Sequence, residues 1–150
     1  MVYDFFVNRI LKGIWHQLKW GVYSFTDPIF YLFLSLGFVG LYVPSPDLQL
    51  PLALLLGKAF IEELFFRFLL QEGLDRFFHY GYRFGPLSLA NILASLTFSC
   101  MHLINQPLNW AVLTFIPSLA FGFIWQRYRS VVPGTIIHFA YNAFLFYQFM

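Results

Sequence analysis

The chain has 150 residues, of which 59% are hydrophobic and 11% are charged. A soluble domain carries about 25% charged residues, so the composition excludes an ordinary soluble protein and a disordered one. The net charge of +2 is too small to indicate a nucleic-acid partner, and the single cysteine, Cys100, excludes an internal disulfide. We therefore expect an integral membrane protein.

Residues 1–26 form an N-terminal amphipathic segment in this interpretation. Apolar side chains share one broad face of a helix over residues 3–20, while Arg9, Lys12, His16 and Lys19 lie mostly elsewhere. Basic residues together with tryptophans suit the headgroup layer of a bilayer. We expect a helix that lies on the membrane surface, and the charges disfavour the alternative of a first membrane span.

Five apolar stretches follow that are candidates for membrane spans. They are residues 28–43, 50–70, 86–104, 108–125 and 131–149. Asp27-Pro28 is a helix-start signal, turns are expected at 44–47 and 105–107, and residues 72–85 form a polar connection. The predicted fold is all-α: a polytopic membrane helix bundle of about five transmembrane helices plus the interfacial helix, in one membrane domain over residues 1–150.

Lysine and arginine alternate between the connections of this bundle. They occur in the N-terminal segment, in the connection with Arg76 and Arg83, and in the connection with Arg127 and Arg129, but not in the other two. Cytoplasmic loops carry the excess of these residues. We expect a protein of a bacterial or archaeal cytoplasmic membrane with its N-terminus inside.

The second apolar stretch contains three ionisable residues close together, Glu62, Glu63 and Arg67. An ionisable group at membrane depth costs roughly 2.5–3.5 kcal/mol on insertion scales and by default indicates function. Glu63 and Arg67 are four residues apart, the spacing of a helical ion pair. Glu62 is then the carboxylate free for chemistry, with Lys58 one turn earlier as a neighbour that can neutralise it.

Later stretches add His102 in the third span, and His138 and Asn142 one turn apart in the fifth. A buried carboxylate such as Glu62 can take a proton from water, and imidazole and amide N–H groups can stabilise an oxyanion. Together these residues are a plausible apparatus for hydrolysing a peptide bond.

The depths of these residues conflict if every span is straight. At about 1.5 Å per residue, Glu62 and His138 lie roughly 12 and 10 Å from the inner side, but His102 lies roughly 24 Å in. The side chains meet only if the third span begins later than Pro86, or if the second helix continues through Phe78 as a long tilted helix.

Three motifs resemble those of the CPBP (Abi) intramembrane proteases, the family of the CAAX-processing and bacteriocin-processing endopeptidases. Residues 62–67 match the EExxxR motif, residues 98–102 the FxxxH motif, and residues 138–142 the HxxxN motif. The resemblance covers a catalytic core over residues 50–146, in the family's order. One departure is Phe68, where a small residue commonly follows the motif arginine.

The resemblance implies a role for each motif residue. Glu62 would activate water together with His102, while His138 and Asn142 would form the oxyanion site. Glu63 and Arg67 support them. The substrate would be a membrane-anchored protein or peptide, and catalysis would need no metal or other cofactor.

Three alternatives stay open at this stage. A zinc site of Glu62, His102 and His138 is chemically possible, although the HExxH spacing is missing. The same residues could serve a small proton- or cation-conducting transporter, or polar residues could merely join the helices of a scaffold. Polar groups concentrate in three of the five spans, which favours one enclosed site. The substrate and the oligomeric state are not set by the sequence.

Overall fold

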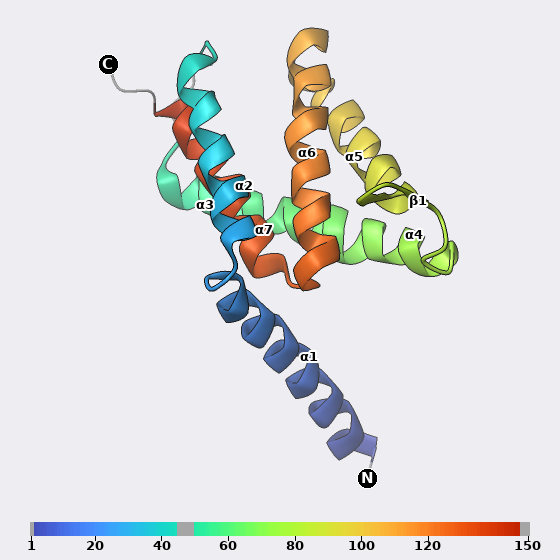
Figure 1. The fold of residues 1–150 in the computed structure, drawn as a ribbon. Coiled ribbons are helices and arrows are strands. Elements are labelled where there is room, and N and C mark those ends of the chain that lie inside the picture. The colour runs from blue at the N-terminus through green and yellow to red at the C-terminus, as the bar shows by residue number, and fades with distance from the viewer. Residues whose placement is uncertain (1, 45–49, 148–150) are drawn as a thin grey trace.

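The computed structural model describes residues 2–44 and 50–147, with side chains from residue 11 onward. Most of the predicted turn at 44–47, the end of the fifth predicted span at 148–149, and the apolar side chains of the N-terminal helix before residue 11 lie outside this part. The fold is all-α apart from a very short hairpin (Figure 1), which confirms the predicted class. The helices are α1 (Val2–Ser24), α2 (Pro28–Leu36), the 3-10 helix η1 (Gly37–Tyr42), α3 (Leu52–Glu63), the π-helix η2 (Leu64–Gln71), α4 (Glu72–Phe77), α5 (Leu89–His102), α6 (Leu108–Tyr128) and α7 (Val131–Phe146).

Helix α2 begins where the Asp27-Pro28 signal predicts. The Asp27 carboxylate accepts a hydrogen bond from the Ile29 backbone N–H at 3.0 Å, and Pro28 occupies the first helical turn. The chain bends by 78° between residues 11–24 of α1 and residues 28–42. Gln17 fixes α1 to the start of α7, because its side chain accepts from the Val131 N–H at 2.8 Å.

Three consecutive helices, α3, η2 and α4, form one continuous rod. The apolar run predicts a helix over residues 50–70, but the observed helix continues to Phe77. The extension is stable because its polar side chains have partners inside the protein: Gln71 donates to the Gly122 carbonyl at 3.0 Å. In the view of Figure 1 the rod runs across the upright α6 helix.

The next helix begins later than predicted. The strands β1 (Arg83–Phe84) and β2 (Leu87–Ser88) form an antiparallel hairpin, and Gly85 turns it with a φ of 59°, a conformation that glycine adopts at no steric cost. Ser88 then caps α5 by accepting from the Asn91 N–H at 3.1 Å. The helix of the second span thus extends almost to Phe78, and α5 begins three residues after Pro86, so both differences go in the direction that would reconcile the depths of the site residues.

Helices α5 and α6 pack through small and polar residues. A Cβ added at Gly122 would lie 1.8 Å from the Asn91 Oδ1 atom, so only glycine allows this approach. Asn91 also donates to the Leu119 carbonyl at 3.1 Å, and Ser99 donates to the Ala111 carbonyl at 2.5 Å. Small residues and interhelical hydrogen bonds of this kind join helices in membranes.

One helix among the described residues, α6, is long and apolar enough to cross a membrane, and the bent pair of residues 11–24 and 28–42 would add a second if it formed one span. Helices α5 and α7 are apolar but shorter. Large apolar side chains are exposed along several helices; examples are Leu32, Leu54, Leu96 and Ile116. Such a surface is unusual for a soluble monomer and suits lipid.

Candidate active site

The rod carries the first three site residues. Glu63 is buried, whereas the Glu62 side chain is 18% exposed. The predicted ion pair is present, with Arg67 Nε 3.7 Å from Glu63 Oε2. The two neighbouring carboxylates thus occupy different environments: one is enclosed with a cation and the other is open to its surroundings.

Arg67 is fully buried and bonds to three helices. Its Nη2 donates to the carbonyl and the hydroxyl of Ser118 at 2.9 and 2.6 Å. Its Nη1 donates to Gln71 at 3.3 Å and to Ser95 at 3.4 Å. The guanidinium is the side chain with enough fixed donors to do this. Sequence analysis missed these partners, whose only signal is a small or polar residue inside an apolar stretch.

His138 of α7 lies between the two glutamates. Its Nδ1 is 3.0 Å from Glu63 Oε1, and its Nε2 is 3.4 Å from Glu62 Oε2. The imidazole is 4% exposed, and the Phe121 ring stacks on it at 4.5 Å between centroids. A Cβ at Gly134 would lie 2.7 Å from Glu63 Oε2, so a glycine one turn before His138 makes room for the buried carboxylate.

These contacts define where a proton resides. We place a proton on Nδ1 of His138, which donates it in a hydrogen bond to Glu63, because an ionised carboxylate can only accept. In a neutral imidazole Nε2 would then be an acceptor facing the acceptor Oε2 of Glu62. A proton on Nε2 relieves this contact, leaves the Glu62 carboxylate an acceptor and gives the ring a second N–H donor.

Among the described residues, no side-chain hydrogen bond or ion pair joins His102 or Asn142 to this cluster. His102 Nδ1 donates to the Phe98 carbonyl at 2.8 Å, which leaves Nε2 as the acceptor of the neutral ring. The Phe98 ring lies 4.4 Å from the His102 ring and 5.9 Å from the His138 ring, between centroids. Among the described residues, no hydrogen bond or ion pair joins His102 to Glu62. Asn142 is half-buried in α7 one turn after His138, and its side chain makes no hydrogen bond within the described part of the chain.

A groove of about 480 Å³ runs along α3 and reaches Glu62. Its walls are otherwise mostly apolar and come from one face of the helix: Leu50, Ala53, Leu54, Gly57, Lys58 and Ile61. Lys58 Nζ lies 3.7 Å from Glu62 Oε1, and its side chain is 48% exposed. A chain segment in this groove would contact the exposed carboxylate directly.

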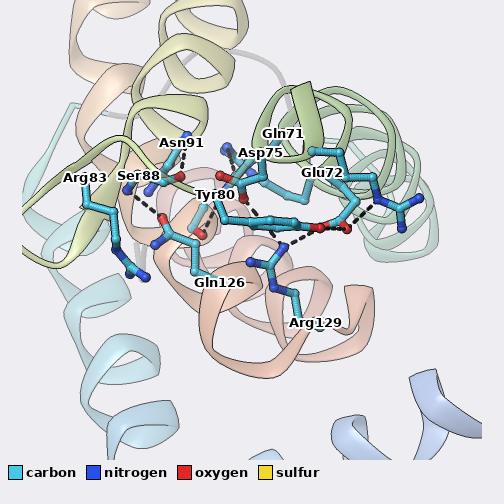
Figure 2. A network of polar contacts seen from close by, with 12 residues as sticks. Gln71, Glu72, Asp75, Tyr80, Arg83, Ser88, Asn91, Gln126 and Arg129 are labelled. Carbon is cyan, nitrogen blue, oxygen red and sulfur yellow. Dashed lines mark hydrogen bonds and ion pairs between the residues drawn. The ribbon is translucent and has the colours of Figure 1, made fainter. Parts of the chain in front are cut away.

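The far end of the rod is held by a separate polar network (Figure 2). Arg129 pairs with Glu72 and lies 3.5 Å from Asp75 Oδ2. Burial raises the pKa of the Glu72 carboxyl, but hydrogen bonds from Arg76 and Tyr80 and the charge of Arg129 outweigh it and hold that pKa below its ordinary value. Burial raises the pKa of Asp75. This network fixes α4 to the end of α6, away from Glu62.

In the part of the chain that the structure describes, no group of three or more histidine, cysteine, aspartate or glutamate side chains is arranged to hold a metal ion. The alternative zinc site of Glu62, His102 and His138 therefore gains no support from the geometry.

Comparison with known proteins gives one family. The family model described as Type II CAAX prenyl endopeptidase Rce1-like matches residues 44–144. No curated protein and no solved structure matches the chain. The matched region covers more than half of the chain and contains Glu62, Glu63, Arg67, His102, His138 and Asn142. The chain belongs to the Rce1-like family of type II CAAX prenyl endopeptidases, a family of integral membrane peptidases.

Proposed function

We propose that this chain is an intramembrane endopeptidase that hydrolyses a peptide bond of a membrane-associated protein or peptide. Family membership implies a peptidase. The observation that carries the finer assignment is the environment of Glu62: a partly exposed carboxylate at a groove, beside a histidine that a buried glutamate–arginine pair holds in place.

The proposed reaction uses Glu62 as the general base. Its carboxylate takes a proton from water while the water oxygen attacks the carbonyl carbon of the substrate. His102, whose Nε2 is a free acceptor, is the second partner of that water. The amide of Asn142 and an N–H of His138 stabilise the resulting oxyanion. The carbon–nitrogen bond then breaks, the leaving amine receives the proton from Glu62, and the products are a carboxylic acid and an amine.

Glu63 and Arg67 act on this chemistry through His138. The Nδ1 contact to Glu63 sets the tautomer and the orientation of the ring, as carboxylate partners do for catalytic histidines. Arg67 compensates the charge of Glu63 and fixes its position relative to α5 and α6. Their proposed role is positioning rather than contact with the substrate.

The positions of several helix ends agree with the proposed five-span topology, although among the described residues only α6, or α6 and the bent pair, is long and apolar enough to cross a membrane. In Figure 1 the α5–α6 turn and the end of α7 lie at one end of the bundle, whereas the α1–α2 turn and the α6–α7 junction lie at the other. The rod Leu52–Phe77 runs across α6 in Figure 1, so in this proposal it is the span most strongly inclined to the membrane normal. Its length of roughly 39 Å at about 1.5 Å per residue exceeds the roughly 30 Å hydrocarbon core. With α2 along the membrane normal, the 78° bend places α1 close to the membrane plane.

Cysteine labelling tests this topology in a Cys100→Ser background. A membrane-impermeant thiol reagent applied to intact cells should label cysteines at positions Ser45 and Asn105. Cysteines at Arg83 and Ser130 should stay protected until the cells are opened. The reverse pattern would place the N-terminus outside.

A cleavage assay with Glu62→Gln tests the catalytic assignment. The purified protein in detergent is given membrane-anchored peptides, and we expect Glu62→Gln to lose cleavage while keeping the wild-type melting temperature, because glutamine keeps the size but not the basicity. Glu72→Gln makes the same change roughly 15 Å further along the rod and should retain cleavage. Cleavage should also survive EDTA. Near-normal turnover by Glu62→Gln would refute the role of this residue.

A further inference from the structure

We propose that a pocket between α1, the rod and the end of α6 binds the phosphate group of an anionic phospholipid from the inner leaflet of the membrane. The pocket has a volume of about 670 Å³, which is within the roughly 300–1,000 Å³ of ligand sites. None of the residues to which we assign the hydrolysis lines it, so this site is separate from the proposed active site.

The polar part of the pocket offers hydrogen-bond donors and no free carboxylate. Glu72 Oε1 accepts from Arg76 Nε at 2.9 Å and from the Tyr80 hydroxyl at 2.8 Å. Glu72 Oε2 accepts from Arg129 Nη1 (Figure 2). Each guanidinium therefore uses one nitrogen for this contact and keeps donors on its other nitrogens.

The charge of the lining selects the kind of ligand. The charged residues that line the pocket are two arginines, Arg76 and Arg129, and one glutamate, Glu72, so one net positive charge remains. Guanidinium groups bind phosphate oxygens through pairs of charge-assisted hydrogen bonds. A phosphate group carries the charge and the several acceptor oxygens that these donors require.

The indole N–H of Trp125 is a further donor in the wall of this pocket. The Trp125 side chain is 3% exposed, and its Nε1 atom has no hydrogen-bond partner among the described residues. Buried polar groups are nearly always paired. A phosphate or ester oxygen of the bound lipid supplies the acceptor that the protein lacks here.

The apolar part of the pocket favours a lipid over a soluble phosphate compound. Ile14 and Phe68 line the pocket, and both side chains are exposed. The Phe68 ring meets the Trp125 ring edge to face, at 5.9 Å between centroids. The glycerol esters and the first acyl carbons of a phospholipid cover these side chains, and burial of apolar surface is favourable.

The place of the pocket fits an anionic headgroup. Arg76 and Arg129 lie in two connections that the distribution of basic residues assigns to the cytoplasmic side, where basic pockets between membrane helices bind anionic headgroups. Gln17 holds the wall that α1 forms: its Nε2 donates to the Arg129 carbonyl at 3.1 Å, and its carbonyl accepts from the Ser130 hydroxyl at 2.8 Å. A lipid in the pocket contacts α1, the rod and α6 together and stabilises their packing.

Thermal unfolding of the delipidated protein in a nonionic detergent tests this site without any cleavage reaction. The probes are phosphatidylglycerol, phosphatidylcholine and glycerol 3-phosphate. A ligand that binds only the folded protein raises its melting temperature, and phosphatidylglycerol at about 100 times its Kd should raise it by roughly 5–10 °C. Phosphatidylcholine, whose choline offsets the phosphate charge, should need about 10-fold more for the same rise, and glycerol 3-phosphate should have no effect.

Three variants locate the binding in the pocket. Arg76→Gln should increase the phosphatidylglycerol concentration needed for a 5 °C rise by about 10-fold, the contribution of one hydrogen bond to a charged group. Without lipid it should melt close to the wild-type protein, because its side chain is 72% exposed. Trp125→Phe, which keeps an aromatic ring but loses the N–H, should increase that concentration by about 3-fold. Arg83→Gln removes an exposed arginine of the same connection that does not line the pocket and should leave it unchanged.

Three outcomes would overturn the proposal. Equal stabilisation by phosphatidylglycerol and phosphatidylcholine would show that the pocket does not select an anion. Stabilisation by glycerol 3-phosphate alone would assign the pocket to a soluble phosphate compound. Equal weakening by Arg76→Gln and Arg83→Gln would show a diffuse attraction of anionic lipid to the basic surface.

Discussion

Removal of the Arg67 side chain should destabilise the protein strongly. In Arg67→Ala the buried carboxylate of Glu63 loses its cation and keeps only the contact with His138. The hydroxyls of Ser95 and Ser118 lose a donor as well. Breaking a buried ion pair by removing one partner costs about 3–5 kcal/mol. At about 2–4 °C per kcal/mol for a chain of this size, the melting temperature should fall by roughly 6–20 °C.

Thermal unfolding of the detergent-purified protein, followed by tryptophan fluorescence, measures this change. Arg76→Ala is the matched control, because Arg76 is on the same rod and forms the same i,i+4 pair with Glu72, but its side chain is 72% exposed. Exposed ion pairs contribute little, so this variant should melt close to the wild-type protein. If Arg67→Ala melts within a degree or two of Arg76→Ala, the buried pair is not structural and the reasoning fails.

Two further substitutions test the space beside Glu63 and the ion pair of Asp27. Gly134→Ala places a Cβ 2.7 Å from the Glu63 carboxylate and should cost about 1–3 kcal/mol through overpacking and slow cleavage. Gly73→Ala, whose Cβ meets no atom within 4 Å, should melt at or above the wild-type temperature, and equal behaviour of the two variants would contradict the prediction. The hydrogen bond from Arg127 is the main reason that the pKa of Asp27 lies below its ordinary value of 3.8. A carboxyl whose pKa is lowered in the folded state stabilises the fold above its ordinary pKa, and this stabilisation is lost as pH falls through the folded-state pKa. The difference in melting temperature between wild type and Asp27→Asn should therefore have its full size near pH 6 and shrink below about pH 3.8. A difference that does not change with pH would refute this.

Local patterns in the sequence were enough to predict the start of α2 and the Glu63–Arg67 pair. Asp27-Pro28 acts through one turn of backbone, and the i,i+4 spacing acts within one helix, so neither depends on the rest of the fold. The end of the rod could not be predicted in this way. Apolarity falls after residue 70, but Gln71 finds its partner on α6, and that tertiary contact is invisible to a local pattern.

The partners within the site were harder to predict than its members. Spacing along a helix predicts which side chains lie on the same face of that helix, but it does not predict which other helix packs on that face. The position of His138 between both glutamates depends on the close approach of α7 that Gly134 permits. The family motifs supplied the role of His102 beside Glu62, and that role remains a prediction, since the described contact to Glu62 comes from His138.

The charges of the site are balanced in two separate pairs, which place the two adjacent glutamates in different environments. Arg67 compensates Glu63 in a closed environment where neither side chain can move without breaking several hydrogen bonds. Lys58 compensates Glu62 at an open groove over 3.7 Å, through a flexible side chain. The first pair is therefore held in place, whereas the second can separate without breaking a hydrogen bond. Of the two carboxylates, Glu62 is therefore the one that a water molecule and a substrate can reach, and this is the ground on which we propose Glu62, and not Glu63, as the general base.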